Sequence, residues 1–431
     1  MKNKSEKISS QMWKWINDLF PICRSITGPG VTLTLDYIKK ILPDLQIHKF
    51  ASGSKVFDWV IPNEWTIRNA YLKDAHGDTI VDYKENNLHI VGYSAPVDRW
   101  LDLDELQSHL HSLVDQKNAI PYVTSYYKQN WGFCLKHDQR EALKPGKYHA
   151  YIDSDLKPGY LRYGELYING KSRQEVFLST YICHPSMANN ELSGPIVTIA
   201  LALWLLSLST RKYSYRIIFI PETIGSIAYL SKNLELLKKN VVAGFNVTCV
   251  GDDRDYTYLP SRSGNTISDR VAKHVLKHIY PQFKKLTWLD RGSDERQYCA
   301  PNINLPVATI MRSAYGHYPE YHTSLDNLSF VTPSGLHGGF NALKSAIHCI
   351  EKNCIAETTV YCEPHLSSRE MYPAISFKGS ATDFQSILDI LSYCDGKVDL
   401  IEISDILNIK FEEVYDIFRK LHKNKLVKII S

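Results

Sequence analysis

The stretch that decides the fold is VFLSTYICHPSMANNELSG, residues 176–194. It begins with a run of apolar and β-branched residues, 176–181, which is typical of a strand buried on both faces. Polar residues follow at once, among them His184, and Gly194 opens a long apolar stretch with the length of a helix. A buried strand, a polar turn and a buried helix in this order predict one unit of an α/β sheet.

The same alternation of strand and helix continues toward the C-terminus. Further buried strands are predicted at 215–220, 244–250 and 307–310, with a helix at 267–279 between the last two. Two helices within residues 11–42 belong to the same unit. We therefore expect the fold class to be α/β, a mixed sheet flanked by helices, formed by residues 1–45 and 150–375.

Residues 46–149 interrupt this unit and differ from it in their pattern of residues. Short segments rich in Val, Ile, Trp and Tyr alternate with turn signals such as Lys144-Pro145-Gly146, which predicts an inserted β-rich domain. Its aromatic residues form either a small core of their own or a lid over a cleft; they include Trp59, Trp65, Tyr122, Tyr126, Tyr127 and Trp131.

Residues 383–431 form a third part, in which three short amphipathic helices precede a strand. This order predicts a winged-helix domain. Residues 384–431 contain seven Lys and Arg against eight Asp and Glu, a difference of 7 − 8 = −1. Because a DNA-binding domain normally has a basic face, the charge favours contact with protein, such as formation of a homo-oligomer, over DNA binding.

Composition restricts the class of protein further. The 431 residues have a formal net charge of +4, which gives no general attraction to nucleic acid or membranes. No apolar run follows the polar N-terminus, and the longest one, Ile196–Leu208, is shorter than the ~20 residues of a membrane span. We expect a cytoplasmic protein with no membrane partner, whose nine cysteines are reduced thiols.

Polar residues that can bind a metal follow several of the predicted strands, where open α/β sheets bind their ligands. His184, Asp252 and His322 are suitable zinc ligands, and Glu222 is suited to accept a proton from a zinc-bound water. Asp253 competes with Asp252 for its role. Glu222 could instead cap the next helix, which requires no catalysis.

The segments containing His184, 189–194, 221–226 and 321–323 resemble, in order and approximate spacing, the co-catalytic zinc aminopeptidases of the leucyl aminopeptidase and glutamate carboxypeptidase type. Over its full length the chain is most similar to bacterial aminopeptidase-like proteins with an inserted β-rich domain and a C-terminal winged helix, often linked to polysaccharide biosynthesis. The most specific parts are CHPSMANNELSG and GHYPEYHTSLDNLSF.

The resemblance implies roles for individual residues. His184 and Asp252 would bind one metal ion, His322 the same or a neighbouring ion, and Glu222 would be the general base. The segment 293–296 resembles the substrate side of the cleft, where Asp294 or Glu295 would hold a substrate amino group. An Asp–Arg pair on the surface is an equally good interpretation of that segment.

Two positions depart from the two-metal pattern. Asn190 stands where an Asp bridges both metals, and Thr223 stands where a Glu binds the second metal. Neither can replace a carboxylate ligand. We therefore expect one Zn²⁺, held by His184, Glu191, Asp252 and His322.

The resulting hypothesis is a zinc-dependent hydrolase of the aminopeptidase type that acts on a small peptide or amide. Two alternatives remain. One is an amidase or acyl-transfer enzyme acting on a sugar or secondary-metabolite amide. The other is a degenerate scaffold that binds a ligand without turnover.

Overall fold

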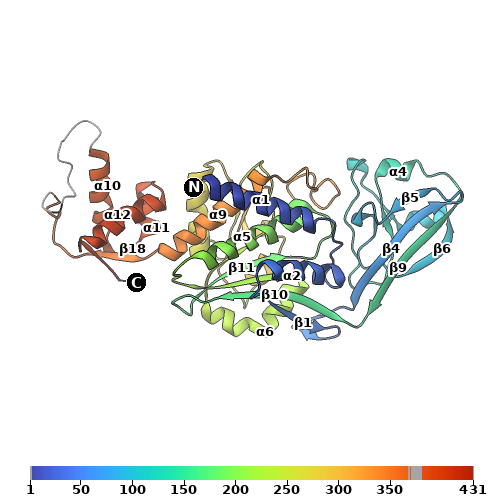
Figure 1. The fold of residues 1–431 in the computed structure, drawn as a ribbon, viewed down its shortest axis with the longest axis horizontal. Helices are drawn as coiled ribbons and strands as arrows, with labels where there is room; N and C mark the ends of the chain where they lie inside the picture. The colour runs from blue at the N-terminus through green and yellow to red at the C-terminus, as the bar shows by residue number, and fades with distance from the viewer. Residues whose placement is uncertain (1, 367–368, 370–380, 431) are drawn as a thin grey trace.

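The computed structural model describes residues 2–366, 369 and 381–430. Three parts follow one another along the long axis of the molecule, with an α/β domain between the inserted β-rich domain and the C-terminal domain (Figure 1). The predicted α/β class is found in the central part. The predicted end of that domain, residue 375, lies outside the described residues.

The central part is built on a mixed sheet of eight strands. Its four middle strands run parallel to one another, and the strands on both sides of them are antiparallel. In spatial order the strands are β1 (Gln46–Ala51), β10 (Tyr160–Ile168), β12 (Ser214–Ile220), β11 (Glu175–Tyr181), β13 (Val241–Asn246), β16 (Val307–Met311), β14 (Thr257–Leu259) and β15 (Lys284–Lys285).

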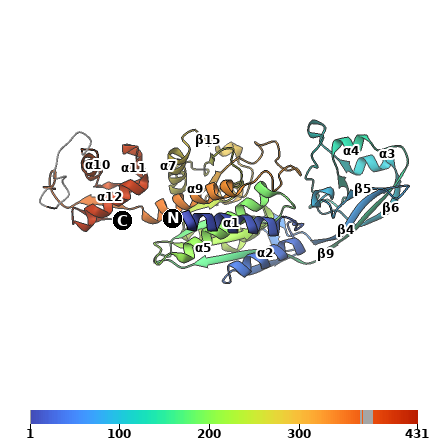
Figure 2. The same ribbon diagram turned by 45° about the horizontal axis from the view of Figure 1, so that its top comes forward.

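Helices cover both faces of this sheet. Side chains of one face share a core with α1 (Lys2–Leu19), α2 (Pro29–Ile41), α5 (Ser193–Ser207), α7 (Ile267–Ile279) and α9 (Pro333–Lys352). The other face packs on α6 (Ile224–Asn240) and the short α8 (Glu295–Tyr298). Figure 2 shows α1 and α9 running beside α5. Ala188–Ser207, which includes α5, is long and apolar enough to cross a membrane, but it is 78% buried in the fold and so acts as a core helix.

The inserted domain contains a second, four-stranded antiparallel sheet in the order β5-β4-β9-β6. These strands are β4 (Glu64–Asp74), β5 (Thr79–Asp82), β6 (Val97–Asp102) and β9 (Lys147–Lys157). Smaller elements complete the domain: β2 (Lys55–Val56), β3 (Trp59–Val60), α3 (Leu103–Leu106), β7 (Leu110–His111), β8 (Phe133–Cys134) and α4 (His137–Glu141).

The C-terminal domain consists of α10 (Ala381–Ser392), β18 (Asp395–Asp399), α11 (Leu400–Leu407), α12 (Phe411–Lys423) and β19 (Val427–Ile429), with β17 (Ile355–Thr358) as the central strand of its sheet. It docks on α7. Arg270 pairs with Asp399 at 2.6 Å and His274 Nδ1 with Asp405 at 2.7 Å.

Three boundaries differ from the sequence-based prediction. Residues 150–157, which we assigned to the α/β domain, belong to β9 of the inserted sheet, where they pair with β4 and β6. Residues 46–51, which we assigned to the insertion, form the edge strand β1 of the main sheet, because they pair with β10 more than a hundred residues later. Residues 355–358 pair with β18 and β19, so they belong to the sheet of the C-terminal domain and not to the α/β domain. In each case the segment pairs with strands that are distant in the sequence, so local patterns do not show to which sheet it belongs.

Candidate active site

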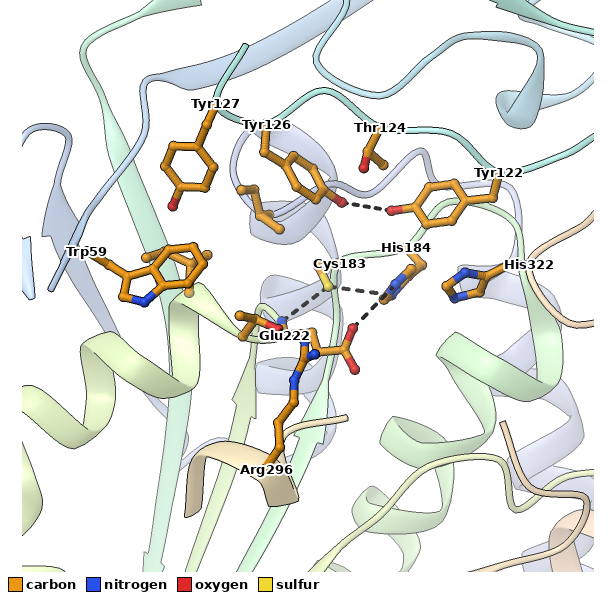
Figure 3. Close-up of a pocket in the computed structure, with 13 residues that line it drawn as sticks. Trp59, Tyr122, Thr124, Tyr126, Tyr127, Cys183, His184, Glu222, Arg296 and His322 are labelled. Carbon is orange, nitrogen blue, oxygen red and sulfur yellow. Dashed lines mark hydrogen bonds and ion pairs between the residues drawn. The ribbon is translucent and has the colours of Figure 1, made fainter. Parts of the chain in front are cut away.

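A pocket of about 410 Å³ lies where β11 and β12 end, beneath the inserted domain. The two strands are parallel neighbours, so the residues that follow them meet at one edge of the sheet. Figure 3 shows His184, Glu222 and His322 around the pocket. The lining residues are Ile26, Trp59, Tyr122, Thr124, Tyr126, Tyr127, Cys183, His184, Glu222, Thr223, Ile224, Arg296 and His322.

His184 is held from behind by Glu191. Its Nδ1 atom lies 3.0 Å from Glu191 Oε2, while the other oxygen of Glu191 lies 3.2 Å from Nε of Arg24, and the side chains of Arg24 and Glu191 are fully buried. Arg24 also donates to the backbone oxygen of His184 at 3.0 Å. The predicted ligand Glu191 therefore orients His184 from outside the pocket, because a buried arginine draws its carboxylate away.

The charges around His184 determine its protonation. Burial alone would lower the pKa of His184, but the hydrogen bond to Glu191 and the charges of Glu191 and Glu222 raise it. His184 Nε2 faces Glu222 Oε2 at 3.6 Å. The imidazole thus stands between two carboxylates, one behind it and one in the pocket.

Glu222 presents its carboxylate to the pocket. Ser293 Oγ donates to Oε1 at 2.7 Å, and the Glu222 backbone N–H donates to Cys183 Sγ at 3.2 Å. Burial raises the pKa of Glu222, which His184 partly counteracts. The residue at the start of α6 is Thr223, with a φ of 62° and no side-chain capping bond, so Glu222 is not placed as a helix cap.

His322 comes from a loop that the inserted domain holds in place. The backbone N–H of Tyr122 donates to His322 O at 2.9 Å, and Pro121 forms a β-bridge with Thr323. The Tyr122 ring lies 5.2 Å from the His184 ring and 5.1 Å from the His322 ring. Burial, with a smaller effect of His184, lowers the pKa of His322 to about 3, so its imidazole is neutral near pH 7.

Asp252 is not among the residues that line the pocket. Its carboxylate accepts hydrogen bonds from Asn189 Nδ2 at 3.1 Å, from Ser313 N and Oγ at 2.9 and 2.8 Å, and from Arg254 N at 2.9 Å. The prediction that it is a metal ligand is therefore not supported, since its oxygens join three segments of the fold. Asp253 accepts from Thr332 and Ser334 at the start of α9.

Asp294 and Glu295 also lie behind the pocket and are fully buried. Glu295 accepts from Gly292 N, Ser293 N, Tyr315 Oη and Asn246 Nδ2 at 2.7–2.9 Å. Asp294 Oδ1 accepts from Thr223 N and Ser226 Oγ, both at 2.8 Å. The predicted contact with a substrate amino group does not fit these positions.

Arg296, the next residue along α8, does line the pocket. Sequence analysis named it only as the partner of a surface pair. It also left open the roles of Trp59, Tyr122, Tyr126 and Tyr127, all of which reach the pocket from the insertion. The signal in the sequence that could have indicated this role is the cluster of aromatic residues in a loop-rich segment. Trp65, from the same cluster, packs instead in the core of the insertion.

The comparisons with known proteins identify the family and the fold of the chain. The model of a family described as a domain of unknown function (DUF4910) matches residues 13–353, and a winged helix-turn-helix family matches residues 354–429. The chain belongs to the DUF4910 family. The predicted winged helix is confirmed, and its match begins at residue 354, next to β17.

One curated relative of this DUF4910 protein, from Clostridium acetobutylicum, is 41% identical over 435 residues, covering 100% of this chain and 98% of its own. Its provisional name is polysaccharide biosynthesis protein with aminopeptidase-like domain. A crystal structure from the same organism, provisionally called a peptidase, covers 100% of this chain and 98% of its own at 41% identity and a TM-score of 0.92.

More distant structures share the fold of the α/β domain. A zinc aminopeptidase from Bacillus subtilis has a TM-score of 0.58 at 13% identity, covering 80% of this chain and 94% of its own. The aminopeptidase from Aneurinibacillus sp. strain AM-1 has a TM-score of 0.51 at 14% identity, covering 79% and 93%. The DUF4910 chain therefore has an aminopeptidase-like fold, and the names of its two relatives contain the words peptidase and aminopeptidase-like domain.

Two groups of side chains are considered as metal ligands, and among the described residues the first brings its donor atoms within 4.8 Å of one another. This first group is Cys183, His184 and Glu191, but Arg24 already neutralises Glu191. His184 Nε2, Glu222 and His322 instead face the pocket. Two imidazoles and one carboxylate fit zinc, and a carboxylate behind a ligating histidine, as Glu191 stands here, is the usual support of such a site.

We expect Asp294→Asn to stabilise the chain, most strongly at alkaline pH. Burial, and then the charge of Glu222, raise the pKa of Asp294 from 3.8 to about 8. Between these pH values the unfolded chain loses the proton while the folded chain keeps it, so stability falls as the pH rises through this window. Asparagine resembles the protonated acid and removes this cost. Thermal unfolding should show a rise in Tm of several degrees at pH 8 and little change at pH 4; an equal shift at both would contradict the assignment.

Proposed function

We propose that this DUF4910 protein hydrolyses amide bonds with the help of one zinc ion bound by His184, His322 and Glu222. The observation that carries the proposal is the 3.6 Å approach of His184 Nε2 and Glu222 Oε2 inside the pocket, beside His322, whose ring lies 5.4 Å from that of His184. Glu191 supports the set, since it leaves Nε2 of His184 directed toward the pocket.

The expected reaction joins water to an amide, RCO–NHR′ + H₂O → RCO₂⁻ + R′NH₃⁺. When bound, zinc supplies polarisation of the carbonyl and a lowered pKa for water. Ser293 orients the Glu222 carboxylate. The hydroxyls of Tyr122 and Tyr126 share a 2.8 Å hydrogen bond in the pocket, and the one that accepts it keeps its own O–H to donate to a substrate carbonyl oxygen.

The two positions that the resemblance matches to a second zinc site do not carry carboxylates. Asn190 Nδ2 donates to Tyr181 Oη at 2.8 Å, and Thr223 Oγ1 accepts from Arg296 Nη2 at 2.7 Å. A guanidinium cation therefore stands beside the residue that the resemblance matches to a second-metal ligand. One positive charge from the chain makes a second metal ion there unnecessary and electrostatically unfavourable.

The substrate is proposed to be a small amide or peptide, and the name of the Clostridium relative favours a step related to polysaccharide biosynthesis. For the winged helix we propose protein contact over DNA binding. The N-terminus of its third helix, α12, donates from Phe411 N to His274 Nε2 at 3.1 Å on the α/β domain, and Glu412 and Glu413 follow. In helix-turn-helix proteins, that end of the recognition helix enters the major groove.

Metal analysis tests the proposal. We expect about one zinc per chain in the purified protein and a loss of most of it in His184→Ala and in His322→Ala. His149→Ala is the matched control, because His149 lies on β9 in the sheet of the inserted domain and pairs with Asp98. A folded wild-type chain that takes up no zinc at neutral pH would contradict the proposal.

A further inference from the structure

The charged side chains that line the pocket indicate which substrates it can bind. Of the lining residues, Glu222 is the one carboxylate and Arg296 the one permanent cation. The pocket thus offers one acidic and one basic partner to a bound molecule.

Among the described residues that line the pocket, Glu222 is the one carboxylate that could pair with a free amino group of a substrate. Asp294 and Glu295 directly precede Arg296 in the sequence. Both are fully buried behind the pocket and hydrogen-bonded to other groups of the chain. Glu222 remains, but it belongs to the metal set of the proposed function. An ammonium group next to a zinc ion would also be repelled by the charge of the metal.

Arg296, in contrast, is available to an anion. Its side chain is exposed, and its Nη2 atom donates to Thr223 Oγ1. Among the residues that the structure describes, no carboxylate lies within the 4.0 Å ion-pair distance of its guanidinium group. A guanidinium has five donors and binds carboxylate or phosphate groups with two parallel hydrogen bonds.

The opposite wall of the pocket is aromatic. Trp59 and Tyr127 are 40% and 56% exposed, and their rings meet edge to face at 5.8 Å. Figure 3 places both rings, with Tyr126, across the pocket from Arg296. Such a wall suits a flat or apolar group on the substrate.

Building on the proposed function, we propose that the site takes N-acylated amides that carry an anionic group, a carboxylate or a phosphate, and that Arg296 binds this anion. Substrates with a free α-amino group are excluded. The chain would then act on acylated acids, and not as an aminopeptidase.

A panel of four dipeptides tests both parts of the inference. Phe-Ala and Phe-Ala-amide have a free amine, whereas N-acetyl-Phe-Ala and N-acetyl-Phe-Ala-amide do not, and one member of each pair carries a carboxylate. We expect kcat/KM to be highest for N-acetyl-Phe-Ala, by about tenfold over its amide. N-acetylglucosamine 1-phosphate against N-acetylglucosamine tests phosphate as the anion. Fastest hydrolysis of a free amine would overturn the inference.

Arg296→Met should remove the preference for the anion. The ratio of kcat/KM between N-acetyl-Phe-Ala and its amide should fall to about one. Arg291→Met is the matched control, since Arg291 is exposed on the same segment but stacks on Trp288 outside the pocket. A preference that survives Arg296→Met overturns the assignment of the anion site.

Binding separates a failure of this inference from a failure of the proposed function. Calorimetry with N-acetyl-phenylalanine and with phenylalanine amide compares the affinity of the pocket for an anion and for an amine, without any need for turnover. If none of the panel is hydrolysed but the anion binds and requires Arg296, the hydrolase proposal fails and the anion site stands. If the amine binds more tightly, or neither compound binds, the inference fails.

Discussion

Replacing Glu222 with glutamine is expected to reduce kcat/KM by about a thousandfold, within the range measured for acid–base and metal-binding groups. A neutral amide holds zinc poorly and cannot accept a proton from water, so the variant loses whichever of these roles the carboxylate has. The side-chain oxygen of the glutamine can still accept the hydrogen bond from Ser293 Oγ, which reaches Glu222 Oε1 at 2.7 Å in the wild-type chain. The fold should therefore persist. Kinetics on the best substrate of the dipeptide panel, with zinc content measured on the same preparation, checks both effects.

The combination of readouts identifies the role of Glu222. We expect zinc and activity to be lost together, because the carboxylate is the third donor in the zinc site that we propose. A variant that keeps its zinc but loses activity would make Glu222 the general base, as the resemblance implies, and not a ligand. Glu320→Gln is the control, because Glu320 pairs with Arg254 and does not itself line the pocket. Full activity of the Glu222 variant would rule out both roles.

The residues that follow strands were predictable from the sequence. His184 and Glu222 each follow a short buried run, and neighbouring parallel strands must end at the same edge of the sheet. The predicted layout of the α/β domain needed little more than this periodicity. The sequence therefore placed these residues together without any knowledge of their side-chain contacts.

The direction in which a carboxylate points could not be predicted. Glu191 and Asp252 both follow the correct elements, yet their partners come from distant segments: Arg24 for Glu191, and Asn189 and Ser313 for Asp252. Local patterns contain no information on such pairs, which depend on how the whole core packs. The same reason applies to Tyr122, whose contact with the His322 loop joins the insertion to the α/β domain.

The inserted domain consequently gains a role that its sequence did not show. It contributes the four aromatic residues that line the pocket, and its backbone fixes the loop of His322. His322 has a φ of 56°, in the left-handed region that non-glycine residues rarely adopt. Such a conformation persists where the surroundings over-determine it, and here the surroundings include another domain.

Arg24→Met is expected to cost about 3–5 kcal/mol of stability, because it leaves the Glu191 carboxylate buried without a cation. Arg24 Nε lies 3.2 Å from Glu191 Oε1, and both side chains are inaccessible to solvent. Water cannot screen the charge that remains, so the α/β domain must either take up a proton at Glu191 or open locally. The loss of Tm should be of the order of 5–10 °C. Zinc binding should weaken as well, since Glu191 orients His184.

Two comparison variants show whether the burial of the Arg24–Glu191 ion pair causes the large loss of stability. Arg254→Met breaks an ion pair with Glu320 in which Arg254 is half exposed, and should cost less than about 1 kcal/mol. The double variant Arg24→Met/Glu191→Gln removes the unpaired charge and should regain much of the stability lost by Arg24→Met alone, because a buried pair replaced on both sides leaves no charge behind. It should not regain zinc affinity, since a neutral amide supports the His184 imidazole less well than a carboxylate. Equal losses in Arg24→Met and Arg254→Met would contradict the view that a buried ion pair positions the metal ligand.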